Sequence, residues 1–177
     1  MTTGAVDDRL RRAKELIESA RFDNAEAELL DLVDNDLEPH QEAEGLYMLA
    51  VTRRYQRAYD KALESIDDLL RYRPDSGRAY QEQGYAYLAQ NRPNDAFRAF
   101  STAVDLNPGL VASWRSLVNL NTRDDRGERA RFAEIQLEYL ESLPPEIVGV
   151  IDLVHEGHLL KADQLCRQFL RKNRHHV

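Results

Sequence analysis

The side chains that could bind a metal ion lie in one short stretch near the end of the chain. His155 and His158 are three residues apart with Glu156 between them, and two imidazole rings at that spacing on one helix could share a metal. Gly157 is, however, the expected turn between two helices, so the two rings need not converge. The sequence also lacks the two-histidine helical pattern of zinc hydrolases. We therefore predict no metal site.

Residues that could act in catalysis are equally isolated. Cys166 is the single cysteine, and no neighbouring base would activate its thiol as a nucleophile. The pair Asp124 and Asp125 falls in an expected turn, where aspartate commonly caps a helix. Glycine-rich loops that cradle phosphates are absent from the sequence. These observations predict a protein that is not an enzyme and carries no cofactor.

Composition narrows the setting in which such a chain works. The 177 residues carry a net charge of −7, with 42% hydrophobic and 31% charged residues. An acidic chain disfavours general binding of nucleic acids, because phosphate contacts need a basic face. No apolar run is long enough to cross a membrane, so no membrane partner is expected. One cysteine and the absence of a signal-like start favour a cytoplasmic location.

The elements that would position any site repeat along the chain with a period of 34 residues. The period relates the large residues Leu46, Tyr80 and Trp114, and it also relates the small residues Ala62, Ala96 and Ala130. Each period reads as two helices with a short polar turn, because its apolar residues follow helical spacing. Small residues in both helices predict a close approach of the pair, and the aromatic residues fill the spaces between pairs.

The unit from 77 to 110 shows the pattern most fully. Gly84 is a small residue on its first helix, and Tyr85 and Tyr87 point to different sides of that helix. Asn91 is the expected turn residue, since asparagine tolerates a left-handed backbone. Pro93 fits the first turn of the second helix, where its missing N–H costs nothing.

These residues resemble the tetratricopeptide repeat (TPR) family, in the 34-residue period, the aromatic opening, and the run Gly84, Tyr87, Ala96, Phe100, Pro108. The resemblance implies an all-α fold, a right-handed superhelical solenoid of antiparallel helix pairs. It predicts one solenoid domain over 1–177 with about five repeats, at about 6–42, 43–76, 77–110, 111–142 and 143–174. In this family the first helix of each pair lines a concave side that usually holds an extended peptide or a partner helix, so the resemblance implies a non-catalytic interaction module that binds a peptide or partner protein in a concave groove.

Helical phase then names the side chains expected in that groove. Tyrosine and arginine make good anchors, because they combine contact area with directed hydrogen bonds. The predicted groove residues are Tyr47, Val51, Arg54, Tyr55, Gln81, Tyr85, Leu88, Arg115, Asn119, Arg123, Ile151 and His155. The alternative for each is a solvated helix face, with Tyr47 and Tyr85 partly packed.

Two further interpretations remain open. The stretches that begin at Trp114 and Gly157 also resemble the repeat region ahead of the catalytic domain in bacterial TPR-sulfotransferase proteins, which would make the chain the front part of an enzyme. The last repeat ends at "RKNRHHV" without a polar capping helix. Its apolar face would then be covered by self-association through the C-terminal repeat, unless the residues after Ala162 form a modified cap.

Overall fold

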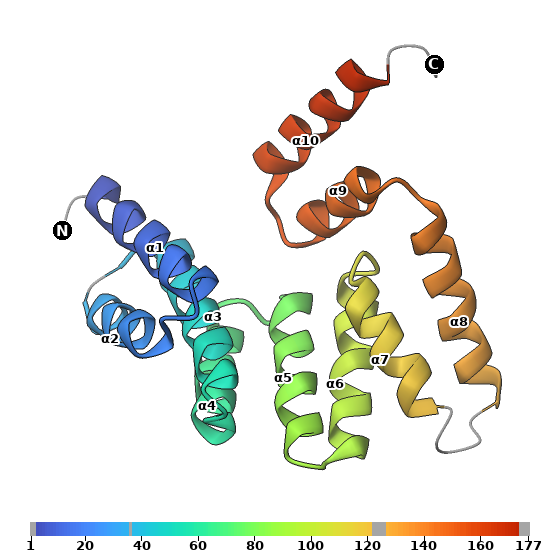
Figure 1. The fold of residues 1–177 in the computed structure, drawn as a ribbon, viewed down its shortest axis with the longest axis horizontal. Helices are drawn as coiled ribbons and strands as arrows, with labels where there is room; N and C mark the ends of the chain where they lie inside the picture. Colours follow the sequence, from blue (N-terminus) through green and yellow to red (C-terminus); the bar gives the residue numbers. More distant parts are fainter. Residues whose placement is uncertain (1–2, 36, 122–126, 174–177) are drawn as a thin grey trace. The chain divides into compact units, whose positions relative to one another are not determined.

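The computed structural model describes residues 3–35, 37–121 and 127–173, and all regular structure in these residues is helical. The helices are α1 (Thr3–Glu18), α2 (Phe22–Val33), α3 (Pro39–Tyr55), α4 (Tyr59–Tyr72), α5 (Gly77–Ala89), α6 (Pro93–Leu106), α7 (Val111–Asn121), α8 (Gly127–Ser142), α9 (Pro145–His155) and α10 (Leu159–Lys172). They follow one another as antiparallel pairs joined by short turns (Figure 1). The predicted all-α fold of about five repeated pairs is confirmed.

The chain forms two compact units. Unit 1 comprises residues Met1–Asp75 and Glu82–Arg92, and unit 2 comprises Ser76–Gln81 and Pro93–Val177. The boundary passes through α5, whose first residues belong to unit 2 and whose remainder belongs to unit 1. The prediction of a single solenoid domain over 1–177 stays a prediction.

Unit 1 is built around a cluster of aliphatic side chains from its first three helices. The cluster consists of Val6, Leu10, Ala13, Leu29, Leu32, Met48 and Leu49, all of them buried. One face of α1 supplies residues at helical spacing, and α2 and α3 supply the facing ones. Arg9 of α1 reinforces this contact at its edge, because its guanidinium donates to the carboxylates of Glu28 and Asp31 on α2.

Small residues set how closely the helices of a pair approach. Ala25, Ala50, Ala62 and Ala96 are each 0% exposed, and all four lie on faces that pack against neighbouring helices. A larger side chain would push the helices apart in an interior packed as densely as a crystal. The predicted packing role of Ala62 and Ala96 is confirmed. The side chain of Ala130 lies outside the described residues.

The turn inside each described pair repeats one backbone conformation. Ala20, Arg57, Asn91 and Gly157 have φ values of 57°, 63°, 55° and 78°. In each turn the next residue donates its N–H to a carbonyl five residues earlier, as Arg92 does to Tyr87 and His158 to Leu153. This bond defines the Schellman ending of a helix, which requires a left-handed residue. The roles predicted for Asn91, Pro93 and Gly157 are confirmed.

In unit 2, α6, α7 and α8 pack in sequence around large apolar side chains. Phe100 of α6 is fully buried, and Trp114 of α7 is 6% exposed. The Trp114 indole N–H donates to the carbonyl of Pro108 at 3.0 Å, so this buried donor has a partner. The ring of Phe132 on α8 meets Trp114 edge-on at 5.9 Å. The predicted filling roles of Phe100 and Trp114 are confirmed.

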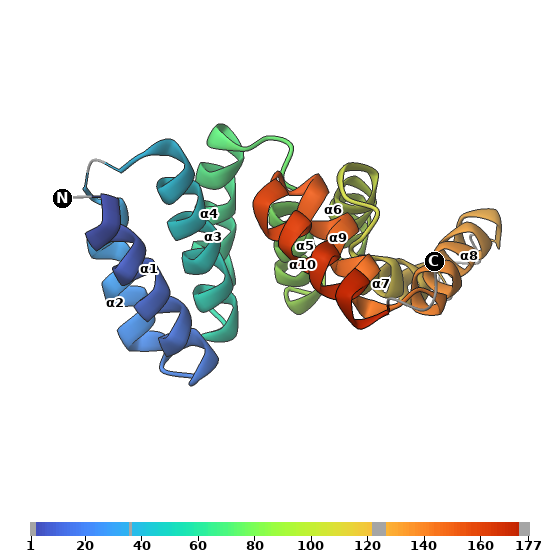
Figure 2. The same cartoon turned by 90° about the horizontal axis from the view of Figure 1, so that it is seen from above.

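The last pair of helices makes a contact that the repeat pattern does not predict. Helix α9 lies across the N-terminal end of α5 and the α6–α7 connector (Figures 1 and 2). Gly109 in the connector permits this, because a Cβ there would come within 2.8 Å of the backbone nitrogen of Asp152. The connector therefore supports α9 by direct backbone contact.

Polar side chains fix α9 in this position. The amide of Asn107, which is fully buried, donates to the carboxylates of Asp152 at 2.8 Å and Glu156 at 3.2 Å. Glu156 also accepts from the backbone N–H of Arg78 at 2.9 Å and from the hydroxyl of Ser76 at 3.1 Å. A carboxylate at the first turn of α5 is stabilised by the free N–H groups and the helix dipole. The α9–α10 pair thus provides the cap of a helix far away in sequence.

None of the described helices combines the length and the apolar character that crossing a membrane would require.

The left-handed turn residues predict a stabilising substitution. Arg57→Gly should raise the free energy of unfolding of unit 1 by about 1 kcal/mol, because a side chain in the left-handed region is strained and glycine is not. Arg57 is exposed, so few contacts are lost. Urea denaturation would measure the change. Ala27→Gly, on the exposed face of α2, is the control and should instead destabilise by about 1 kcal/mol. A destabilised Arg57→Gly protein would contradict the account.

The buried network predicts that one amide holds α9 in place. Asn107→Ala leaves the carboxylates of Asp152 and Glu156 short of a donor, at a cost of about 1–3 kcal/mol for each such group. Amide hydrogen exchange over Pro145–His155 should then become at least about tenfold faster. Asn24→Ala, exposed on α2, should leave that exchange unchanged. Unchanged protection in Asn107→Ala would show that the network does not secure α9.

Candidate functional site

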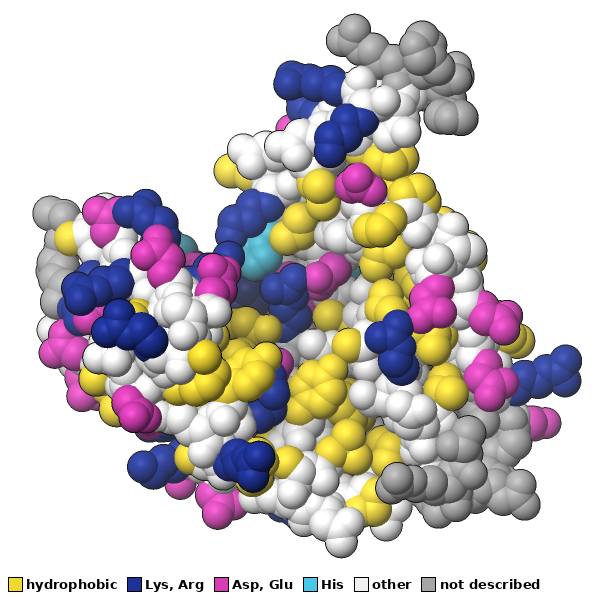
Figure 3. Space-filling model, in the orientation of Figure 1, with side chains coloured by type: hydrophobic (Ala, Val, Ile, Leu, Met, Phe, Trp, Pro, Cys, Tyr) yellow, Lys and Arg dark blue, Asp and Glu magenta, His cyan; other side chains and the backbone are white. Residues whose placement is uncertain are grey.

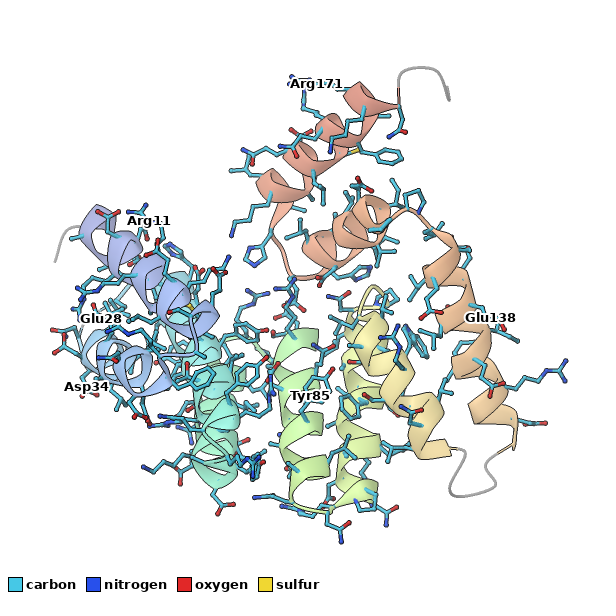
Figure 4. The ribbon with its side chains drawn as sticks, in the orientation of Figure 1. Arg11, Glu28, Asp34, Tyr85, Glu138 and Arg171 are labelled. Atoms are coloured by element: carbon cyan, nitrogen blue, oxygen red, sulfur yellow. The ribbon has the colours of Figure 1, made fainter. Side chains whose placement is uncertain are left out.

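A pocket of about 550 Å³ opens where α3 ends, α4 begins and the second half of α5 passes them, all within unit 1. Its lining residues are Arg54, Tyr55, Tyr59, Tyr85, Leu88 and Ala89. The α3–α4 turn explains part of this grouping, because it reverses the chain at Arg57 and leaves tyrosines on both sides. Figure 4 labels Tyr85, which α5 contributes to the pocket.

The arginine of the pocket is held from behind by a buried carboxylate. The Nε of Arg54 donates to Oε2 of Glu82, which lies on α5 one turn before Tyr85. The Glu82 side chain is 6% exposed and that of Arg54 is 20% exposed. The pair therefore lies largely out of water and fixes the guanidinium in one position.

Burial sets the electrostatics of this pair. It raises the pKa of the Glu82 carboxyl above its ordinary value, and the adjacent Arg54 guanidinium offsets only part of that rise. Arginine remains charged in proteins, so Arg54 is a permanent cation against Glu82. With Glu82 ionised, the two charges cancel locally. The pocket consequently has an aromatic character more than a basic one.

Aromatic rings complete the arrangement around Arg54. Its guanidinium carbon lies 4.4 Å from the ring centre of Tyr55 and 5.2 Å from that of Tyr85. Tyr55 is also stacked on Phe22 of α2, with 5.2 Å between ring centres and 5° between planes. These contacts orient the rings before any ligand arrives, although Tyr55 remains 52% exposed. The pocket is thus ready-formed and open to solvent.

Two of the predicted groove residues in unit 1 lie outside this pocket. Tyr47 is half-buried and packs against the aliphatic cluster of α1, α2 and α3. Val51 is half-buried on α3. The structure therefore brings four of the predicted residues together in the pocket, namely Arg54, Tyr55, Tyr85 and Leu88.

The predicted residues of unit 2 have other contacts. The side-chain oxygen of Gln81 accepts from the hydroxyl of Ser113 at 2.9 Å, which joins α5 to α7. Arg115 pairs with Glu141 of α8 at 2.7 Å, and Asn119 is exposed on α7. Arg123 lies outside the described residues.

The two groove residues predicted on α9 face the α6–α7 connector. A Cβ at Gly109 would lie 3.1 Å from the side chain of Ile151, and the Nδ1 of His155 is 3.1 Å from the carbonyl of Leu106. No group of three or more potential metal ligands occurs among the residues that the structure describes. His155 therefore has a structural contact in the docking of α9.

Sequence reasoning missed Glu82 and Tyr59. The sequence did indicate a buried ion pair at Glu82, because this lone carboxylate lies between Ala79 and Ala86, which are buried on one face of the same helix. A charge on such a face usually requires a buried partner of opposite sign. The indication for Tyr59 was weaker, since it follows Tyr55 by four residues but lies on the next helix.

Comparisons with known proteins place the chain in context. A sequence model of the family described as tetratricopeptide repeat matches residues 47–111 and 82–141, which together span more than half of the chain. No curated protein matches the sequence.

Solved structures share the fold at low sequence identity. MamA from Desulfovibrio magneticus RS-1 is 20% identical with a TM-score of 0.65, over 77% of this chain and 75% of that one. A thermophilic TPR protein of Thermus thermophilus is 20% identical with a TM-score of 0.62, over 97% and 93% of the two chains. PcrH, in complex with the chaperone binding region of PopD, is 15% identical with a TM-score of 0.55, over 80% and 95%.

The buried pair predicts an asymmetric response to mutation. Arg54→Met removes the cation and leaves Glu82 buried without it, which should lower the free energy of unfolding by about 3 kcal/mol near neutral pH. Glu82→Gln removes the charge but keeps an acceptor for Arg54, so it should cost only about 1 kcal/mol. Urea denaturation of the two variants would measure the difference.

The pH dependence separates this account from simple loss of packing. Because the pKa of Glu82 is raised by folding, this carboxyl takes up its proton at a higher pH in the folded protein than in the unfolded chain. The cost of burying the charge is therefore full above the folded pKa and disappears as the pH falls toward the unfolded value. The loss in Arg54→Met should therefore be largest on the alkaline side and shrink as the pH is lowered toward the range in which an unfolded glutamate takes up its proton. A loss that stays constant, or that Arg54→Met with Glu82→Gln does not relieve, would contradict the assignment.

Proposed function

Because the chain belongs to the tetratricopeptide repeat family, we propose that it is a non-catalytic protein-interaction module. It holds an extended peptide or a segment of a partner protein against the first helices of its repeats. The observation that carries this proposal is the pocket at Arg54, Tyr55 and Tyr85, which is formed within unit 1 from side chains already fixed in place.

The chemistry of the pocket indicates what it would accept. Three tyrosine rings and Leu88 offer apolar area, and Glu82 already compensates the charge of Arg54. An apolar or aromatic side chain of the peptide suits such a pocket better than a carboxylate does. The tyrosine hydroxyls and the guanidinium can donate hydrogen bonds to peptide carbonyls. Binding then orders little of the scaffold, which favours affinity.

A structural relative supports this choice of ligand. The PcrH structure contains the chaperone binding region of PopD, so a related fold does hold a segment of another protein. In this chain we assign the same kind of role to the pocket of unit 1. The groove prediction for Gln81, Arg115, Asn119 and Arg123 in unit 2 stays a prediction, and so does a cytoplasmic location.

An enzymatic alternative gains no observation in its favour. The pocket holds tyrosines, an arginine, a leucine and an alanine, and it has no histidine, cysteine or carboxylate in its lining. None of the similar structures named above is described as a sulfotransferase. The aromatic pocket of unit 1 suits an interaction module, and we keep that module, without a cofactor, as the proposed function.

Selection from a peptide display library, with the whole chain as bait, would test the proposal. The selected peptides should share an apolar or aromatic residue, and Tyr85→Ala should weaken the best of them at least about tenfold in a titration. Tyr59→Ala should act in the same direction. Arg54 is unsuitable for this purpose, because its removal leaves the buried charge of Glu82 without its partner and destabilises the fold.

The matched control is Tyr72→Ala, a tyrosine on α4 that is 48% exposed and outside the pocket. It should leave the affinity unchanged. Peptides that bind the Tyr85→Ala and Tyr59→Ala variants as tightly as the original chain would place the binding surface elsewhere and refute the pocket assignment.

A further inference from the structure

Helix α8 exposes a stripe of large apolar side chains. Phe132, Ile135 and Tyr139 follow one another at helical spacing and are 57%, 52% and 57% exposed. A different face of the helix buries Ala133 and Leu140. Arrays of stacked repeats bury such faces under a following helix pair. The α8 stripe therefore has the composition of an interface, although no described segment covers it.

Charges beside this stripe are mostly acidic. The exposed charged side chains described on α8 are Glu128, Arg131, Glu134, Glu138 and Glu141. Figure 3 shows acidic side chains along this helix, and Figure 4 shows Glu138 on its outer side. An apolar stripe with an acidic border suits a basic partner best.

Helix α10 carries the complementary surface. Leu159, Leu160 and Leu170 are 64%, 81% and 49% exposed. The exposed charged side chains described on α10 are Lys161, Asp163, Arg167, Arg171 and Lys172. Basic residues thus outnumber acids among the described charges of α10, whereas acids outnumber arginines in the sequence of α8. Figure 4 shows Arg171 at the far end of α10.

We propose that α8 of one copy binds α10 of a second copy of this chain. Both helices expose large apolar side chains and differ in the sign of their charge, and they span similar lengths of about 24 and 21 Å. Pairing α8 with α8 would set acid against acid, and pairing α10 with α10 would set base against base. Charge therefore selects the unlike pairing of two copies.

An unlike pairing has a consequence for assembly. Each bound copy still presents one unused α8 or α10 surface, so further copies add head to tail. The mass in solution should exceed the 20.4 kDa of one chain and rise with concentration. It should fall again in about 1 M salt, where the screening length shrinks to about 3 Å.

Two variants that each remove one surface test the pairing. Ile135→Lys should disable α8, and Leu160→Glu should disable α10. Both positions are more than half exposed, so the fold should survive, and circular dichroism would check this. Each variant alone should sediment as a monomer, with association weakened at least about tenfold. An equal mixture should form a dimer of one copy of each, because one variant keeps α10 and the other keeps α8.

The same sedimentation experiment can contradict the proposal in three ways. A parent chain that stays monomeric at every concentration removes the interface altogether. Variants that associate like the parent place the contact elsewhere. A mixture that stays monomeric after each variant alone has lost association means that a single α8–α10 contact does not hold two copies together. Glu64→Lys on α4 is the control for a charge change outside both surfaces and should associate like the parent.

Reversing the charges tests the border of the contact independently. Glu138→Lys or Arg171→Glu alone should weaken association, and mixing the two should restore part of it, because the exchanged charges again attract. No recovery on mixing would show that charge does not select the pairing. Since none of these residues lies in the pocket of unit 1, peptide binding and self-association can fail separately.

Discussion

The close approach of paired helices is the constraint on which the rest of this structure depends. It leaves room for little more than a methyl group at Ala25, Ala50, Ala62 and Ala96, all of which are fully buried. Helices this close can be joined by a very short turn, and the turn then needs a left-handed residue to end the first helix. Every larger side chain must point to a neighbouring pair or to solvent. The surfaces available for binding are therefore fixed by where the small residues are.

This constraint explains why the fold could be predicted from the sequence. Small residues and turn residues recur at a period of 34, and their roles are local, so Asn91, Pro93 and Ala96 could be assigned without knowledge of distant contacts. The docking of α9 could not be predicted in the same way. It depends on Asn107 meeting Asp152 and Glu156, which are 45 and 49 residues away along the chain. Nothing in the periodicity marks that meeting.

The site was predictable to a similar extent. Helical phase placed Arg54, Tyr55 and Tyr85 toward one side, and the structure brings these three side chains to one pocket. Phase alone could not show that Glu82 lies behind Arg54, since the two are 28 residues apart. This contact changes the role assigned to Arg54, because a cation that neutralises a buried carboxylate contributes mainly to the stability of the fold. The tyrosines are then left as the groups that a ligand would distinguish.

The buried carboxylates of the two units have different structural roles. Glu82 fixes a side chain that a ligand can reach, and it does so inside one patch of unit 1. Glu156 instead fixes a whole helix pair, because it caps α5 from the turn after α9. Holding α9 on the α6–α7 connector gives that pair a fixed place, while the stripe at Phe132, Ile135 and Tyr139 stays exposed. Unit 2 therefore combines a polar contact that the repeat pattern does not predict, the docking of α9, with an exposed apolar stripe on α8 that suits binding to another copy.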